Sequence, residues 1–398
     1  METRKVYFQY LDALRCLAFI AVFYAHTGTI FAGATVTHNF PLNIWMKFTV
    51  YGSYGVNFFF VLSGFLITYL LLKERTETGS ISIKNFYIRR ILRIWPVYFV
   101  TFFIGVCVLP FLISSDVYNV FIMTNPIMSL QTITYYFFFL GNFYQGLGFG
   151  IASLSIGILW SVCVEEQFYL VWPWIVRQFS TRRLMLVTAL LISLSLLYKY
   201  IWADDRLGNY YLPWSVGMDL GFGALLGMYY FENKKREVVK HAFTIAAASL
   251  LLIAATVGIG YTGHASIKSN LIEVLRLVKT PLIDCLFILI LIFFIQKTAA
   301  IKTDNSHPLI KFFHLSKGKI GGALIYLGKI SYGLYAYHTI CLMLVVTTFY
   351  RSGFLKVNVT RPMFFVTVIS AFLLAVGVAH LSSTYLERPI TALKRKMK

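Results

Sequence analysis

The sequence has 398 residues, of which 58% are hydrophobic and only 13% are charged, and its mean hydropathy is +0.70. Soluble globular domains carry about 25% charged residues, so this composition excludes an ordinary soluble protein. A net charge of +20 is compatible with nucleic-acid binding, but the placement of the basic residues decides their use. The composition predicts an all-α membrane protein, a single polytopic helical domain over residues 1–398.

Ten stretches are predicted to span a membrane, since roughly 20 apolar residues cross a hydrocarbon core about 30 Å thick. In chain order they cover residues 10–31, 56–72, 95–113, 153–176, 184–203, 213–231, 242–261, 281–295, 331–350 and 363–386. Residues 73–93 are expected to form a basic loop. Residues 132–140 are too short to cross, which predicts an interfacial or re-entrant segment. The bundle is expected over about residues 10–390, with a basic cytoplasmic tail over 391–398.

The distribution of lysine and arginine predicts the orientation. With a cytoplasmic N-terminus, the cytoplasmic segments carry 26 of these residues and the opposite connections carry 9. Cytoplasmic loops are enriched in Lys and Arg, so both termini are predicted to be cytoplasmic. The positive charge then belongs mainly to the cytoplasmic face, which argues against nucleic acid as a partner.

The first predicted span carries Asp12 and Arg15 near its start and His26 near its end. At roughly 100° per residue, Arg15 and His26 lie on one helix face, about 16 Å apart along the axis. Ionisable side chains within a span are by default functional. Simpler interpretations remain open: Arg15 reaches the interface or pairs with Asp12, and His26 is a satisfied interior histidine. Charges inside the apolar run and the many later spans exclude a secretory signal peptide.

Three arginines precede the third predicted span. Arg89 and Arg93 are one helical turn apart and share a face, with Arg90 adjacent. Planar guanidinium groups bind phosphate oxygens in pairs of hydrogen bonds, so the cluster suits a soluble polyphosphate ligand. The alternative is a positive anchor that contacts lipid phosphates.

Polar groups also interrupt the fourth and ninth predicted spans. Glu165 and Glu166 either form a structural ion pair with a buried basic group or orient a catalytic imidazole. Adjacent residues point about 100° apart, so one glutamate is expected to face the site, and the sequence leaves open which one. Tyr332 begins the ninth span, and His338 lies well inside it as a site residue or a packed interior histidine.

The connection over residues 114–152 has no Lys or Arg, and many of its side chains are aromatic rings or amides. Asn142, Tyr144 and Gln145 stand among glycines, which allow close backbone approach. Rings for sugar faces and amides for hydroxyls predict a platform that binds a glycan acceptor. The alternative is an interfacial aromatic belt. Other polar and aromatic residues of this connection are Asp116, Tyr118, Asn119, Tyr135 and Tyr136.

Taken in this order, the motifs resemble the membrane acyltransferase-3 family. The resemblance covers nearly the whole chain. It is carried by Asp12, Arg15 and His26; residues 55–65; Arg89, Arg90 and Arg93; Trp160, Ser161 and residues 165–170; Ser331, Tyr332 and His338; and Glu387, Arg388 and Pro389. It implies about ten spans with cytoplasmic termini in a bacterial inner (plasma) membrane. It also implies an acyl-CoA, here acetyl-CoA, as the co-substrate. We expect no permanently bound cofactor, and no paired spacing of the five cysteines indicates a metal site.

The resemblance implies an O-acyltransferase that moves an acyl, here acetyl, group from cytoplasmic acyl-CoA to a hydroxyl of an extracytoplasmic or lipid-linked glycan. Its catalytic positions match Arg15 and His26, with Glu165 and Glu166 beside them. His26 would act as a general base or carry the acyl group. Its donor-binding positions match Arg89, Arg90 and Arg93 for the CoA phosphates, to which Tyr332 and His338 are added. Some members carry a fused hydrolase-like domain, and this chain is expected to be a stand-alone form, which disfavours the peptidoglycan branch.

Two interpretations from other classes remain open. One is a transporter or flippase for a lipid-linked glycan, because polar groups in spans also mark transport paths. The other is a non-catalytic subunit of a polysaccharide-export assembly. The arginine cluster discriminates between them and the enzyme, since CoA binding requires it. The acceptor sugar and the oligomeric state stay open.

Overall fold

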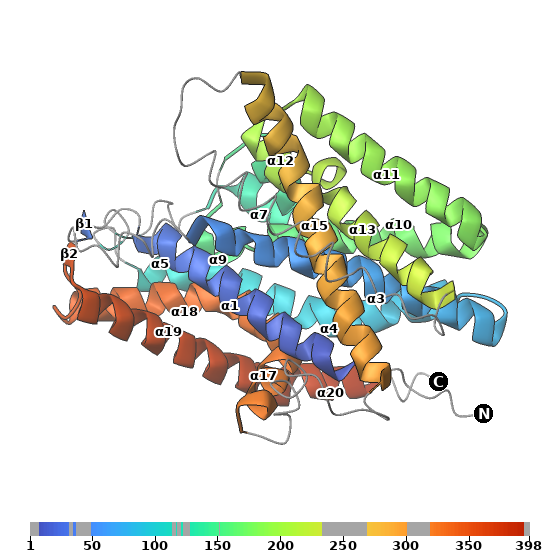
Figure 1. Cartoon of the computed structure of the whole chain (residues 1–398). Helices are drawn as coiled ribbons and strands as arrows, with labels where there is room; N and C mark the ends of the chain where they lie inside the picture. The colour runs from blue at the N-terminus through green and yellow to red at the C-terminus, as the bar shows by residue number, and fades with distance from the viewer. Residues whose placement is uncertain are drawn as a thin grey trace. The chain divides into compact units, whose positions relative to one another are not determined.

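The computed structural model describes residues 8–31, 35–36, 49–113, 117, 121, 128–150, 152–232, 269–300 and 319–393. In these ranges nearly all regular structure is helical (Figure 1). Seven helical segments of the described chain are long and apolar enough to cross a membrane. They are Tyr10–Phe31, Tyr51–Thr78, Ile83–Leu112, Leu154–Gln178, Thr181–Ile201, Ser331–Arg351 and Arg361–Ala392. The expected class, an all-α protein with several membrane-length helices, is confirmed.

Two further predicted spans coincide with helices, α13 (Pro213–Glu232) and α15 (Ser269–Ala300). The predicted span over residues 242–261 lies outside the described residues, as do Asp116, Tyr118 and Asn119. The number of ten spans and the cytoplasmic location of both termini therefore stay predictions.

The chain divides into two compact units, each built from segments far apart in the sequence. Unit 1 comprises Met1–Arg15, Asn57–Ile81 and Val171–Gly328, and unit 2 comprises Cys16–Val56, Ser82–Leu170 and Lys329–Lys398. Three of the five boundaries fall inside the helices α1 (Gln9–Phe31), α3 (Tyr54–Thr78) and α10 (Trp160–Gln178).

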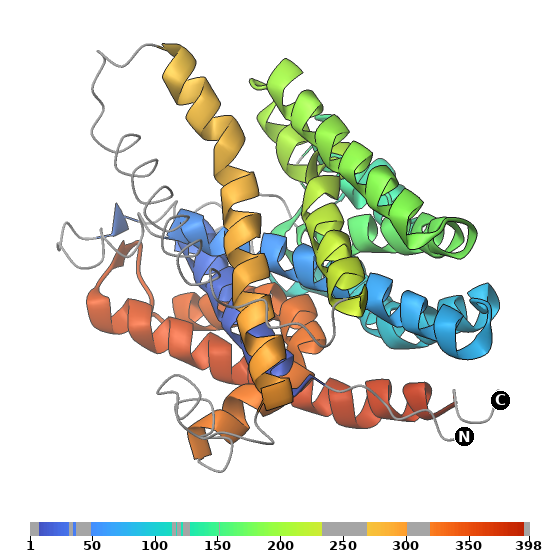
Figure 2. The ribbon, with the colours of Figure 1, turned by 45° about the vertical axis from the view of Figure 1, so that its right-hand side comes forward.

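In unit 1, α11 (Thr181–Ile201) and α13 lie side by side (Figures 1 and 2). The short α12 (Arg206–Tyr211) precedes α13. Glycines let α13 approach α3 closely. A Cβ on Gly223 would lie 1.9 Å from the carbonyl oxygen of Val61, and one on Gly64 would lie 2.0 Å from that of Leu220. Small residues at such crossings allow the close packing typical of membrane helices.

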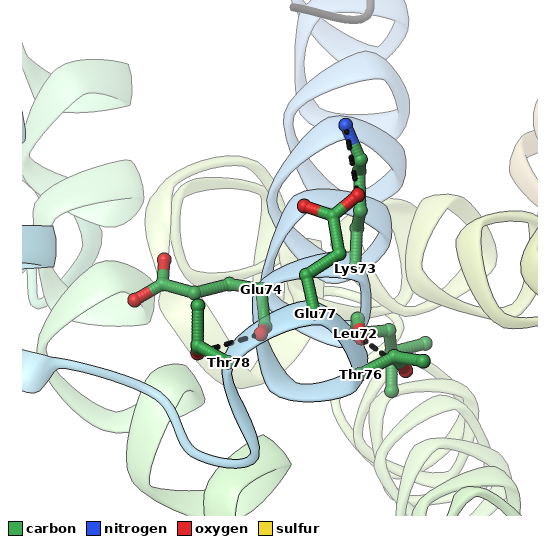
Figure 3. A network of polar contacts seen from close by, with 6 residues as sticks. All are labelled: Leu72, Lys73, Glu74, Thr76, Glu77 and Thr78. Carbon is green, nitrogen blue, oxygen red and sulfur yellow. Dashed lines mark hydrogen bonds and ion pairs between the residues drawn. The ribbon is translucent and has the colours of Figure 1, made fainter. Parts of the chain in front are cut away.

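Local polar contacts connect side chains at the end of α3 (Figure 3). The hydroxyls of Thr76 and Thr78 donate to backbone carbonyls one turn earlier, at 3.0 and 2.8 Å. Lys73 and Glu77, also one turn apart, form an ion pair at 3.4 Å. The helix thus continues to Thr78, past the apolar run that marks the predicted span.

The expected basic loop over residues 73–93 is therefore wrong in its secondary structure. α3 continues to Thr78, and α4 (Ile83–Phe103) begins after Ser82, whose hydroxyl accepts from the backbone N–H of Asn85 at 3.4 Å. Lys, Arg and Glu are good helix formers, so polar composition alone does not indicate a loop here. The arginines Arg89, Arg90 and Arg93 consequently sit on a regular helix.

Unit 2 holds most of the predicted site residues. Antiparallel α18 (Ser331–Arg351) and α19 (Arg361–Ser382) pack along their length (Figure 1). The two-residue strands β1 (Thr35–Val36) and β2 (Asn358–Val359) pair in parallel. Unit 2 also contains the 3-10 helix Val50–Ser53 and the short π-helices Ile104–Val108 and Ser383–Glu387. Its further short helices are α5 (Leu109–Leu112), α7 (Leu130–Phe137), α8 (Gly141–Gly146), α9 (Leu154–Gly157) and α20 (Arg388–Ala392). Helix α17 (Lys319–Lys329) ends where unit 2 resumes.

Candidate active site

Two histidines from distant parts of the sequence meet in unit 2. Nε2 of His338, on α18, lies 3.0 Å from Nδ1 of His26, on α1. His338 is 0% exposed, whereas His26 is partly exposed. The sequence interpretation placed His338 among the donor-binding residues, and the structure places it in contact with His26. A role in donor binding stays a prediction.

Hydrogen bonds determine the tautomers of both rings. Nδ1 of His338 lies 2.7 Å from the carbonyl oxygen of Tyr335, which can only accept, so this nitrogen carries a proton. In the neutral ring, Nε2 of His338 is therefore an acceptor. Nδ1 of His26 lies between that nitrogen and the carbonyl oxygen of Val22, 2.9 Å away, so it also carries a proton. Nε2 of His26 then holds a lone pair, and no described residue hydrogen-bonds to it.

The residues around His338 hold it rigidly. The Tyr335 hydroxyl contacts the Ser161 hydroxyl at 2.7 Å and donates to the carbonyl oxygen of Ile158 at 3.2 Å. Phe19 and Phe23, on α1, contact the His338 ring at centroid distances of 5.7 and 6.1 Å. An anchored backbone carbonyl and an aromatic wall thus leave the imidazole little freedom to turn. Sequence reasoning gave Tyr335 no role, although its position three residues before His338 is the available signal.

Arg15 is paired locally, as one of the open interpretations proposed. Its guanidinium forms an ion pair with Asp12 at 2.8 Å, one turn earlier on α1. Both residues belong to unit 1, whereas His26 belongs to unit 2. The pair holds the guanidinium against its own helix and partly neutralises it.

The three arginines of α4 form a second polar group in unit 2. The Arg90 guanidinium lies over the rings of Phe86 and Tyr169, 5.6 and 5.4 Å from their centroids. Its buried Nε has no hydrogen-bond partner among the described residues. Arg89 and Arg93 lie close enough to interact electrostatically with Arg90. Three neighbouring guanidinium groups create a concentrated positive charge that favours a polyanion.

Glu166 belongs to this arginine group. Its Oε2 accepts from the indole N–H of Trp95 at 3.0 Å, while its buried Oε1 has no partner within the described chain. Glu166 also interacts electrostatically with Arg90. Glu165 instead accepts from the Tyr169 hydroxyl at 2.9 Å. Of the two glutamates, Glu166 is therefore the one that interacts with Arg90. Which of them faces the catalytic histidine stays open.

Tyr332 is placed beside the same arginines. Its hydroxyl donates to the carbonyl oxygen of Ile94, the residue after Arg93, at 2.8 Å. Glu387 lies near Arg93 and accepts from the Ser382 hydroxyl at 3.2 Å. The start of α18 and the π-helix after α19 thus lie next to the arginine group.

The amides of α8 point into the protein. Asn142 and Gln167 exchange hydrogen bonds at 3.2 and 2.8 Å, and Asn142 is 0% exposed. Gln145 is also buried and donates to the hydroxyl of Tyr136 and, at 3.1 Å, to the carbonyl oxygen of Gly157. Tyr144 is buried too, against neighbouring aromatic rings. These contacts hold the connection together, and a role in acceptor binding stays a prediction.

Comparisons with known proteins agree with the motifs. The model of acyltransferase family 3, described as an acyltransferase domain, matches residues 8–380. A Listeria monocytogenes peptidoglycan O-acetyltransferase, OatA, is 29% identical over 263 residues, covering 64% of this chain and 38% of that protein. An uncharacterised Haemophilus influenzae protein is 33% identical over 217 residues, covering 50% of this chain and 84% of its own length.

A Staphylococcus aureus protein provisionally named an O-acetyltransferase is 25% identical over 360 residues, covering 85% of this chain and 52% of that protein. The chain thus spans about two fifths to one half of the length of the O-acetyltransferases that it matches. No solved structure matches the chain significantly. The family match extends over nearly all of the sequence, and this chain belongs to acyltransferase family 3.

Proposed function

We propose that this protein is a membrane O-acetyltransferase. It takes an acetyl group from acyl-CoA on the cytoplasmic face of the bacterial inner membrane and transfers it to a hydroxyl of an extracytoplasmic or lipid-linked glycan. The observation that carries the proposal is the His26–His338 pair, in which Nε2 of His26 keeps a lone pair and no described residue occupies it.

That lone pair serves either of two routes. In the first, Nε2 removes the proton of an acceptor hydroxyl as the oxygen attacks the thioester, and CoA leaves as the thiol. In the second, Nε2 attacks the thioester itself, CoA leaves, and the acyl-imidazole is then cleaved by the acceptor hydroxyl. Both routes place positive charge on His26. The acceptor nitrogen of His338 and the carbonyl of Val22 stabilise that charge by accepting the Nδ1 proton.

The arginine group is the proposed CoA site. Phosphate oxygens accept charge-assisted hydrogen bonds from guanidinium groups, and the Nε of Arg90 needs an acceptor. The rings of Phe86 and Tyr169 orient this guanidinium. In this assignment Tyr332 belongs to the donor side through its contact with α4, while His338 belongs to the catalytic pair.

The acceptor class rests on the relatives. OatA of Listeria is named for peptidoglycan, and this name supports a hydroxylated carbohydrate acceptor. We propose a glycan without committing to a sugar. The connection that contains α8, with Asn142, Tyr144 and Gln145, is the proposed place for it.

The proposal is tested with acetyl-CoA labelled in the acetyl group and purified full-length protein in vesicles. We expect label to enter glycan extracted from the host, and His26→Ala to abolish this transfer while the exposed His380→Ala keeps it. Label bound to the protein before acceptor is added would identify the acyl-imidazole route. A well-folded His26→Ala protein that still transfers label would refute the assignment. Movement of a lipid-linked glycan without any labelling would favour the flippase instead.

A further inference from the structure

Unit 1 contains a buried polar group that takes no part in the proposed reaction. Four of its helices contribute to it: α3 with Asn57, α11 with Lys199, α13 with Asp219 and α15 with Asp284. Both aspartates are 0% exposed. Asn57 donates from Nδ2 to one oxygen of Asp219 at 2.8 Å.

The acceptors of this group outnumber its donors. The second oxygen of Asp219 and both oxygens of Asp284 are buried and have no hydrogen-bond partner among the described residues. The two carboxyl groups are adjacent, close enough to share a hydrogen bond if one of them carried a proton. Lys199 interacts electrostatically with both, and Cys285 is a further titratable neighbour of Asp284.

A further buried polar group lies on the same face of α11 as Lys199, at Ser195. It lies one turn before Lys199 and so shares its face of α11. Ser195 is 1% exposed, and its hydroxyl lacks a partner within the described residues. This hydroxyl faces α13, because a Cβ on Gly217 would lie 3.6 Å from it. This unsatisfied buried hydroxyl thus lies at the contact between α11 and α13, one turn before Lys199.

The charges of the group do not balance. Two carboxylates and one ammonium leave one negative charge in a buried, low-dielectric setting, where an uncompensated ion is strongly disfavoured. A purely structural ion pair needs Lys199 and only one aspartate. The second aspartate therefore calls for one more positive charge.

We infer that Asp219, Asp284 and Lys199 form an exchangeable site for a single monovalent cation, either a proton or Na⁺. A proton bridges the two carboxyl groups and satisfies both. A sodium ion takes oxygen ligands from the two carboxylates. The chemistry is the same in both cases, since one positive charge completes the group.

Two measurements on purified full-length protein separate the sources. The first is the thermal unfolding midpoint in NaCl against choline chloride at equal ionic strength, because a ligand that binds only the folded state raises the midpoint as its concentration exceeds its Kd. The second is the infrared carbonyl stretch of a protonated carboxyl group at neutral pH. A sodium site predicts a saturable rise in the midpoint with Na⁺. A proton site predicts a protonated-carboxyl band that Na⁺ does not remove.

Asp284→Asn is the main variant. In it the charges of Asp219 and Lys199 balance each other, so the group no longer needs a further cation. We expect it to fold and to lose both the Na⁺ response and the infrared band. Asp204→Asn, at an exposed position in a turn, is the matched control and should keep whichever signal the wild type shows. Lys199→Gln should strengthen the signal, with half-saturation at a lower Na⁺ concentration or with a more intense band.

A wild-type protein that shows neither signal, and so behaves like Asp284→Asn in both measurements, would overturn the inference. An unchanged response in folded Lys199→Gln would also overturn it, because the charge count depends on this ammonium.

Discussion

Nε2 of His338 accepts the Nδ1 proton of His26 across 3.0 Å, joining two residues that are 312 positions apart in the sequence. The carbonyl of Tyr335 fixes the other side of the His338 ring at 2.7 Å. His338 is thus a positioning residue: it orients His26 and determines which nitrogen of that ring is free. This arrangement resembles the logic of a catalytic triad, with a neutral imidazole in place of the carboxylate.

Replacing His338 should therefore lower the turnover number and not the affinity for acyl-CoA. One lost hydrogen bond to a group that becomes charged costs about 1.5–3 kcal/mol, so His338→Ala should reduce kcat roughly 10–150-fold at about 1.4 kcal/mol per decade. His338→Gln, whose side-chain oxygen can accept the same proton, should recover part of the loss. Steady-state kinetics with acyl-CoA varied would check this. A change in KM alone would mean that His338 acts on the donor, as the sequence first suggested.

The arginine group predicts an effect on donor affinity. If Arg93 contacts CoA phosphate, Arg93→Ala should lose about 1.5–3 kcal/mol of binding and raise the half-saturating acyl-CoA concentration roughly 10–150-fold. Arg93→Lys should recover this only in part, because an ammonium lacks the guanidinium fork. The exposed Arg182→Ala serves as the control. Full recovery by lysine would identify the group as a simple charge anchor.

Glu166 predicts a contrast between two substitutions. Glu166→Gln keeps an acceptor for the indole of Trp95 but removes a negative charge beside Arg90, so acyl-CoA affinity should hold or rise while kcat changes little. Glu166→Ala leaves the indole N–H unsatisfied and should lower the free energy of unfolding by about 1–3 kcal/mol. Kinetics and thermal unfolding together check both. A large loss of kcat in Glu166→Gln would instead support the predicted catalytic role.

In the connection that contains α8, we expect some residues to affect stability and others to affect acceptor binding. Asn142→Ala should reduce stability by about 1–3 kcal/mol, because Gln167 then loses a buried partner. Tyr144 packs its ring on Phe149 and does not belong to the amide pair of Asn142 and Gln167. It is therefore the better probe of acceptor binding. If the acceptor binds here, Tyr144→Ala should raise the acceptor KM and leave the acyl-CoA KM unchanged. Wild-type behaviour at limiting acceptor would make the connection purely structural.

The crossing of α3 and α13 predicts a large effect from a single methyl group. Gly223→Ala would put a Cβ 1.9 Å from the carbonyl oxygen of Val61, which forces the helices apart. Overpacking of this kind costs about 1–3 kcal/mol or more. Gly377→Ala, whose Cβ meets nothing within 4 Å, is the control and should be tolerated. The yield of monodisperse protein and its unfolding temperature measure the difference.

Much of this protein was predictable from local sequence. Apolar runs of membrane length mark most of the described long helices. Inside a bilayer a spanning segment must satisfy its own backbone hydrogen bonds, so an apolar run of that length predicts a helix. The arginine group is also local, since Arg89, Arg90 and Arg93 follow one another on α4. The pairing of Arg15 with Asp12 is an i, i+3 contact of the kind that spacing alone suggests.

Tertiary packing alone decided the rest. Nothing in the sequence states that His338 meets His26 or that Glu166 faces Trp95, because partners so far apart are chosen by which helices pack together. Polar composition likewise does not reveal whether a side chain points away from the protein or into it. Asn142 and Gln145 read as an open sugar platform, yet buried amides must find partners, and theirs are Gln167, Tyr136 and the carbonyl of Gly157. Helix packing also brings Asp219, Asp284 and Lys199 together within unit 1, since they come from three separate helices.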